Sequence, residues 1–131
     1  MSNLTIGITT CNRMKYTQGL VQSLGKDILD ENQIIVVDNG SQEKDFKEFL
    51  EKTFCKKNHT LFLRSPDHRD WINDEYIAKN LIIDNAKNEI ILFLQDDQQY
   101  LFDKDTLYAV SSAFTKVNCP SLDVNAVRKI T

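Results

Sequence analysis

Two stretches of this 131-residue sequence decide its fold: QIIVVDNGS at residues 33–41 and EIILFLQDD at residues 89–97. Each is an apolar run that ends in carboxylates, a pattern typical of strands buried on both faces of a parallel sheet. Open α/β sheets bind their ligands outside the carboxyl ends of such strands. Carboxylates gathered there repel one another unless a cation or the donors of a ligand lie between them. The two stretches therefore predict a site for a polar ligand and a metal, which we interpret as a nucleotide with its metal.

Strand and helix patterns alternate on either side of these stretches. Apolar runs predict strands at residues 4–9, 33–37, 59–64 and 90–94. Helical spacing of apolar residues predicts helices at residues 20–28, 46–54, 73–85 and 107–117. This alternation favours an α/β, Rossmann-like fold, in which helices cover both faces of a mostly parallel sheet. We expect one domain over residues 1–131, and no core-sized element in residues 122–131, so that the fold stops soon after the acidic stretch.

Composition bounds the class of protein. With 41% hydrophobic and 27% charged residues, the chain has the make-up of a soluble globular domain. Its net charge of -3 argues against nucleic acid as a partner. Three widely spaced cysteines suggest neither a disulfide framework nor a zinc knuckle. No apolar run reaches the roughly 20 residues of a membrane span, and no basic signal sequence opens the chain. We therefore expect a cytoplasmic protein without a transmembrane segment.

Four motifs carry a resemblance to a known family. They are LTIGITTCNR at residues 4–13, VVDNGS at 36–41, AKN at 78–80 and ILFLQDD at 91–97. In this order and spacing they resemble the N-terminal half of a family 2 glycosyltransferase, which has the GT-A fold and transfers a sugar from a nucleotide donor. The resemblance covers nearly all of this chain but only about the first half of a usual catalytic domain. It implies a nucleotide-sugar donor, UDP-sugar in the first place, a divalent metal such as Mn²⁺ or Mg²⁺, and inverting transfer to a glycan, lipid or protein.

Candidate nucleotide-binding residues follow the first two predicted strands. The resemblance places nucleoside recognition at Asp38, whose carboxylate can accept from a uracil imide or a ribose hydroxyl. An Asx turn closed by Asp38 itself is the alternative. Thr9, Thr10 and Asn12 are expected to frame the base. Arg13 is expected to pair with the diphosphate, because guanidinium binds phosphate in a bidentate way; a solvated cation at the front of a helix is the alternative.

The acidic pair at the end of the second stretch is the metal candidate. Hard cations favour carboxylate oxygens and bridge to phosphate oxygens. The family motif is Asp-x-Asp, and the resemblance puts Gln95 at its first acidic position. The resemblance therefore implies that Asp97 binds the metal and that Asp96 contacts the ribose. The alternative is that the two residues only form a polar turn after a buried strand. Lys79, on the third predicted helix, is the last candidate for nucleotide binding, although most helix lysines face solvent.

The general base that inverting transfer requires is not assigned. In the family it lies well beyond the metal motif, and Asp103 and Asp105 match no catalytic position. The expected function is therefore a donor-binding half that is not expected to catalyse alone. Two alternatives stay open. One is a non-catalytic nucleotide- or partner-binding module that self-associates through an exposed sheet edge. The other is a nucleotidyltransferase, although TCNR at residues 10–13 is not a Gly-rich phosphate loop. Peripheral contact with a membrane-embedded acceptor is also left open.

Overall fold

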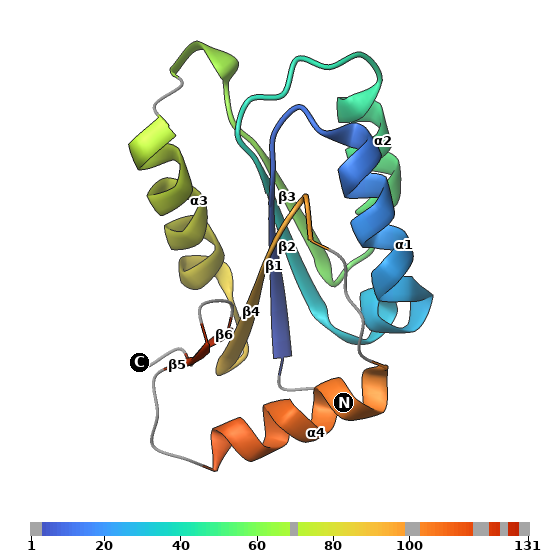
Figure 1. Cartoon of the computed structure of the whole chain (residues 1–131). Coiled ribbons are helices and arrows are strands. Elements are labelled where there is room, and N and C mark those ends of the chain that lie inside the picture. The colour runs from blue at the N-terminus through green and yellow to red at the C-terminus, as the bar shows by residue number, and fades with distance from the viewer. Residues whose placement is uncertain (1–3, 69–70, 99–102, 117–120, 124–125, 129–131) are drawn as a thin grey trace.

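Six strands form one sheet in the order β3-β2-β1-β4-β6-β5 (Figure 1). The computed structural model describes residues 4–68, 71–98, 103–116, 121–123 and 126–128. The strands are β1 (Leu4–Thr10), β2 (Gln33–Asp38), β3 (His59–Leu63), β4 (Ile90–Gln95), β5 (Ser121–Asp123) and β6 (Ala126–Arg128). Strands β1 to β4 are parallel, whereas β6 pairs antiparallel with both β4 and β5. The prediction of an α/β fold with a mostly parallel sheet is confirmed.

Helices cover both faces of the sheet. They are α1 (Met14–Glu31), α2 (Phe46–Thr53), the 3₁₀ helix η1 (Pro66–His68), α3 (Trp71–Asn85) and α4 (Lys104–Thr115). Figure 1 shows α1 and α2 on one side of the sheet, α3 on the other, and α4 across the end at which β1 begins. Helix α1 is broken at Gly25, where φ is 82°. Helix α3 begins at Trp71, slightly before the predicted starts at Asn73 and Asp74.

The two faces of each central strand enter two separate cores. On β2, Ile34 and Val36 pack in a cluster with α1 and α2, whereas Ile35 and Val37 pack in a cluster with α3. This alternation explains why the strand sequence is apolar at every position rather than at every second one. All four side chains are fully buried. The strand β2 is therefore packed against helices on both faces of the sheet.

Gly7 in β1 is a point of close approach between the sheet and α3. A Cβ atom built at Gly7 would lie 2.6 Å from Cγ2 of Ile82 on α3. Ile82 is itself fully buried, so it has little room to move away. A side chain at this position would push α3 off the sheet or force the core to repack.

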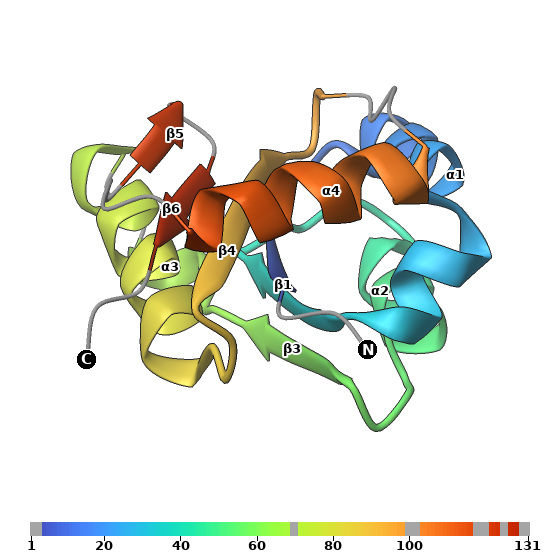
Figure 2. The same cartoon turned by 90° about the horizontal axis from the view of Figure 1, so that it is seen from below.

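The C-terminal residues form more structure than the sequence predicted. Strands β5 and β6 have three residues each, and β6 pairs with β4 through Ile90↔Arg128 and Leu92↔Ala126 (Figure 2). Runs this short carry no readable alternation, which is why the pattern at residues 122–131 did not reveal them. Because β6 covers the edge of β4, β3 and β5 are the outer strands of the described sheet. Among the described residues no helix is both long and apolar enough to cross a membrane.

Candidate functional site at the strand tips

The carboxyl ends of β1, β2 and β4 lie side by side (Figure 1). The register pairs Thr10 at the end of β1 with Asp38 at the end of β2. On the other side of β1, the backbone N–H of Asp96 donates to the carbonyl oxygen of Thr9 over 3.1 Å. Two acidic segments that are far apart in the sequence therefore flank the same strand end. This edge of a parallel sheet is where α/β proteins hold ligands.

Asp96 is oriented by the end of β1. Its residue is only 7% exposed, and its Oδ2 accepts from the backbone N–H of Cys11 at 3.3 Å and from Oγ1 of Thr10 at 3.4 Å. Thr10 is held in turn by Thr17 on α1, with 2.8 Å between the two hydroxyl oxygens. Burial raises the pKa of the Asp96 carboxyl, and the Cys11 N–H and the Arg13 charge oppose that shift. The carboxylate is thus preorganised by the first strand.

Arg13 stands beside both carboxylates of the acidic pair. Its Nη1 lies 3.5 Å from Oδ2 of Asp97 and 3.7 Å from Oδ1 of Asp96. The Arg13 and Asp97 side chains are about half exposed, at 51% and 48%, so both can reach a ligand. The structure therefore brings the predicted diphosphate residue into contact with the predicted metal residue.

The donor chemistry of this pair fits a hard divalent cation. Within the described ranges no group of three or more candidate protein ligands gathers at one point. Mg²⁺-type sites use one or two carboxylates and complete their shell with water and substrate phosphate. Asp97 and Asp96 suit that arrangement. Gln95 is exposed at the end of β4, where its backbone N–H donates to Oε1 of Gln98 at 2.7 Å.

Asp38 closes a turn of its own. Its Oδ2 accepts the backbone N–H of Ser41 at 3.0 Å, and its Oδ1 accepts the Ser41 hydroxyl. These bonds are those of the Asx-turn alternative. A carboxylate has about four lone-pair positions, so a turn of this kind and a contact with a ligand are compatible. Asp38 is 4% exposed, and its position at the strand tip is set by the ladder to Thr10.

Asn12 is engaged with the loop that follows β2. The side-chain Oδ1 of Asn12 accepts the backbone N–H groups of Gln42 at 2.6 Å and Glu43 at 3.1 Å. The backbone N–H of Asn12 donates to Oγ of Ser41 at 2.7 Å. Asn12 adopts φ 52°, in the left-handed region that asparagine tolerates better than most residues. No local pattern indicated this link, because it joins residues about 30 positions apart.

Lys79 is not brought against the other candidates. The contacts of its Nζ in the described part of the chain are an ion pair with Glu75 on the same helix, at 3.1 Å, and the ring of Phe93, at 5.8 Å from the centroid. An i,i+4 pair and a cation–π contact are ordinary means of fixing a helix lysine.

Arg64 is a residue that the sequence reasoning missed. Its Nη1 donates to Oδ1 of Asn39 at 2.8 Å and to Oδ1 of Asp74 on α3 at 3.0 Å. The Arg64 and Asp74 side chains are 19% and 8% exposed, so this is a largely buried ion pair. It ties the loop that begins at Asp38 to the start of α3. The sequence signal that could have revealed Arg64 is its position directly after an apolar strand, because a charged group that becomes buried there needs a partner.

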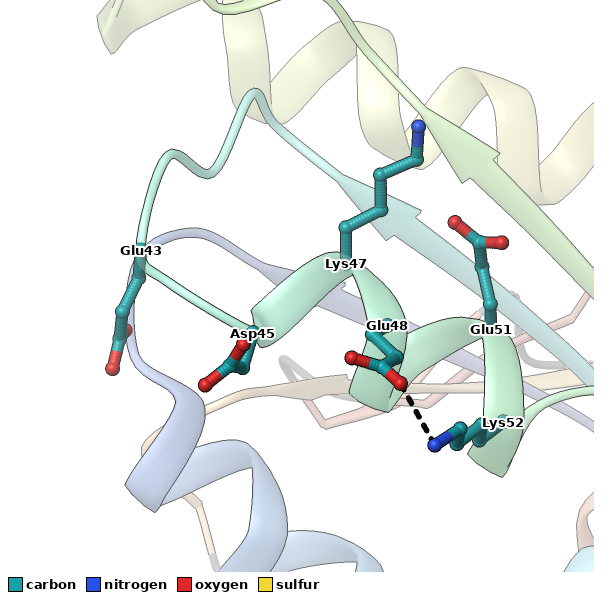
Figure 3. A pocket seen from close by; sticks show the side chains of 6 residues that line it. All are labelled: Glu43, Asp45, Lys47, Glu48, Glu51 and Lys52. Carbon is teal, nitrogen blue, oxygen red and sulfur yellow. Dashed lines mark ion pairs between the residues drawn. The ribbon is translucent and has the colours of Figure 1, made fainter.

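A charged hollow beside α2 shares Glu43 with the loop that Asn12 contacts, but none of the candidate nucleotide- or metal-binding residues lines it. Six residues line it: Glu43, Asp45, Lys47, Glu48, Glu51 and Lys52 (Figure 3). Glu48 and Lys52 pair at 2.8 Å, and both are well exposed. All six lining side chains are charged, and the surface is best explained as the solvated face of a short amphipathic helix.

The sheet, its helices on both faces and the acidic strand tips define the GT-A fold. The chain belongs to glycosyl transferase family 2, whose profile matches residues 5–119. No curated protein matches the chain.

Three solved structures with the same fold have chains about three times as long as this one. S. aureus TarS 1-349 is 23% identical, with a TM-score of 0.63, over 88% of this chain and 33% of that one. Its complex with UDP-GlcNAc gives 20% identity and a TM-score of 0.60, over 88% and 32%. The mannosyltransferase PcManGT from Pyrobaculum calidifontis, in complex with GDP-Man and Mn²⁺, gives 17% and 0.62, over 84% and 32%. The chain thus spans about a third of the length of these proteins. At such identities the likeness establishes the fold.

Proposed function

We propose that this chain binds the nucleotide-diphosphate part of a sugar donor at the tips of β1, β2 and β4, as the donor-binding portion of a glycosyltransferase. The observation that carries the proposal is the contact of Arg13 with both Asp96 and Asp97, next to the strand end that also bears Asp38. The Arg13 guanidinium can pair with the phosphates of a ligand, and the two carboxylates beside it can hold the metal that such a ligand carries. Family membership and the nucleotide-sugar complexes of TarS and PcManGT support it.

Different residues are proposed to contact different parts of the donor nucleotide. Asp38 accepts hydrogen bonds from the base or the ribose, with Thr9 and Thr10 forming the adjoining strand end. Asp96 faces the ribose, and Arg13 pairs with the diphosphate oxygens. UDP is the expected nucleotide, on the resemblance of the sequence alone.

Asp97 is the proposed metal ligand, with Asp96 beside it. A divalent cation bound there neutralises charge on the departing diphosphate. The Arg13 guanidinium lies beside the same two carboxylates, where a divalent cation would compete with it. Arg13 would then be available to pair with the diphosphate oxygens.

Sugar transfer itself needs a general base that we do not assign. Oδ1 of Asp103 accepts the backbone N–H of Thr106 at 2.7 Å, so Asp103 caps α4. Figure 1 places α4 at the opposite end of the sheet from the strand tips. Neither Asp103 nor Asp105 therefore belongs to the donor site. Donor binding is proposed for this chain, inverting transfer for the complete catalytic unit, and the acceptor and a cytoplasmic location stay predictions.

Competition and product assays test this function. The purified chain is titrated with UDP, GDP and dTDP in the presence of Mn²⁺, and the proposal expects UDP to bind most tightly. Incubation with a nucleotide sugar then separates the alternatives. Release of UDP indicates sugar transfer, and binding without release indicates a donor-binding module. Release of pyrophosphate from a nucleoside triphosphate would instead establish a nucleotidyltransferase and overturn the proposal.

A further inference from the structure

A clasp of hydrogen bonds joins the loop after β1 to the loop after β2. We define the clasp as Asn12, Ser41, Gln42 and Glu43. Asn12 receives the backbone N–H groups of Gln42 and Glu43 on its Oδ1, at 2.6 Å and 3.1 Å, and donates its own N–H to Oγ of Ser41 at 2.7 Å. The side chain of Asn12 therefore holds Gln42 and Glu43, and its backbone N–H holds Ser41, so this one residue contacts three successive residues of the opposite loop.

Both ends of the clasp continue into the proposed donor site. Ser41 donates its hydroxyl and its backbone N–H to the carboxylate of Asp38. Glu43 accepts the backbone N–H of Met14, the first residue of α1, on its Oε2 at 3.1 Å. Arg13 lies between Asn12 and Met14 in the chain. The clasp thus fixes the backbone on both sides of Arg13 and the turn that orients Asp38.

We propose that Asn12 is a positioning residue, which acts on the donor nucleotide through this clasp rather than by touching it. The inference rests on the proposed function, and it replaces the expectation that Asn12 frames the base. The Oδ1 of Asn12 already accepts two hydrogen bonds. Because an amide carbonyl has two lone pairs, the side chain of Asn12 has no acceptor position left to offer a base. The nucleoside residue and the diphosphate residue come from different strands, so their mutual geometry depends on a link of this kind.

The left-handed conformation of Asn12 makes a clean substitution available. Glycine accepts φ 52° without strain, so Asn12→Gly removes the acceptor while keeping the backbone. Ser41→Ala removes the hydroxyl that connects Asn12 with Asp38. If the clasp is one unit, the double variant loses little more nucleotide affinity than either single variant. Two independent contacts with the nucleotide would give additive losses.

Asn58 supplies a matched control. Its Nδ2 donates to the carbonyl oxygens of Leu29 and Asn32, at 2.9 Å and 2.5 Å, so it also ties two segments together. Asn58 immediately precedes β3, at the end of the sheet opposite the strand tips. Asn58→Ala therefore weakens the fold through a comparable loss of hydrogen bonds without touching the proposed site.

The experiment combines calorimetric titration with UDP and Mn²⁺, amide hydrogen exchange of the ligand-free protein, and thermal unfolding. We expect Asn12→Gly to bind UDP roughly tenfold more weakly, the loss given by one to two ordinary hydrogen bonds. Faster exchange at Gln42 and Glu43 should accompany it. Asn58→Ala should lower the unfolding temperature while its UDP affinity stays within about twofold of the parent, as expected for a site that it does not contact.

Three results would overturn the inference: unchanged UDP affinity in Asn12→Gly, unchanged exchange at Gln42 and Glu43, or additive losses in the double variant. Failure of the parent chain to bind any nucleotide would refute the proposed function instead. In that case the exchange rates still decide whether Asn12 holds the opposite loop, because they are measured without ligand.

Discussion

Arg13→Gln should raise the affinity of the ligand-free protein for Mn²⁺ and lower its affinity for UDP. The Arg13 Nη1 lies 3.5 Å from an Asp97 oxygen and 3.7 Å from an Asp96 oxygen, where it competes with a metal for the same carboxylates. Exposed ion pairs contribute about 0.2–1 kcal/mol each, so the two pairs together oppose metal binding by about 0.4–2 kcal/mol. This range corresponds to a roughly two- to thirtyfold gain in Mn²⁺ affinity. UDP binds more weakly because a bidentate phosphate partner is lost.

Free Mn²⁺, followed by electron paramagnetic resonance during titration without nucleotide, measures the first effect, and calorimetry with UDP measures the second. Lys15→Gln is the control, since Lys15 is an exposed cation in the first turn of α1, two residues after Arg13, and the described residues show no ion pair for it. It should leave the Mn²⁺ affinity unchanged. An Arg13→Gln protein that binds Mn²⁺ no more tightly than the parent would show that Arg13 does not occupy the metal's surroundings, and the reasoning from the ion pairs would be wrong.

Three further predictions follow from the packing and the charges. Gly7→Ala should destabilise the fold by about 1–3 kcal/mol in urea unfolding, because its Cβ meets a buried side chain. Gly19→Ala, which has open space around it inside α1, should instead stabilise by about 0.5–1 kcal/mol; equal effects would contradict the packing argument. The pKa of Asp30 is lowered to about 2 by hydrogen bonds from two lysines, so Asp30 contributes stability that is present above its unfolded pKa and lost as the pH falls from about 4 to about 2. Asp30→Asn should flatten the pH dependence of the unfolding temperature in that window, and an unaltered profile would refute the pairing. Arg64→Met should cost about 1.5–3 kcal/mol, the contribution of a hydrogen bond to a charged group, since the largely buried Asp74 carboxylate loses its ion pair with Arg64. Arg64→Met/Asp74→Asn should recover part of that loss, and no recovery in denaturant unfolding would argue against the pair.

The sheet was predictable because its central strands are buried on both faces. Such strands carry uninterrupted apolar runs, and the turn chemistry after Val37 and Leu94 marks where they end. The rule that parallel strands direct their carboxyl ends to one edge then places Asp38 and the acidic pair near each other, and the register and hydrogen bonds confirm that placement. The position of the candidate site in the fold could therefore be predicted from the strands alone.

The contacts within the site depend on tertiary geometry that no local pattern encodes. Asn12 has the residue type of a ligand contact, but its partners lie in a loop about 30 residues further along the chain. Arg64 carried no motif, and its role appears only when α3 brings Asp74 beside it. Lys79 matched the family motif, yet its described contacts keep it on the α3 surface. The types and order of the residues predicted where the candidate site lies in the fold. Their hydrogen-bond and ion-pair partners depend on the tertiary structure.

Calorimetric titration of the parent chain and of Asp97→Ala with UDP, each with and without Mn²⁺, tests the central claim most directly. Asp105→Ala is the control, because Asp105 lies in α4 at the opposite end of the sheet (Figure 1). The account predicts that Mn²⁺ strengthens UDP binding to the parent and to Asp105→Ala, and that this gain disappears in Asp97→Ala. A parent chain that binds no nucleotide, or an Asp97→Ala chain that keeps the full Mn²⁺-dependent affinity, would contradict it.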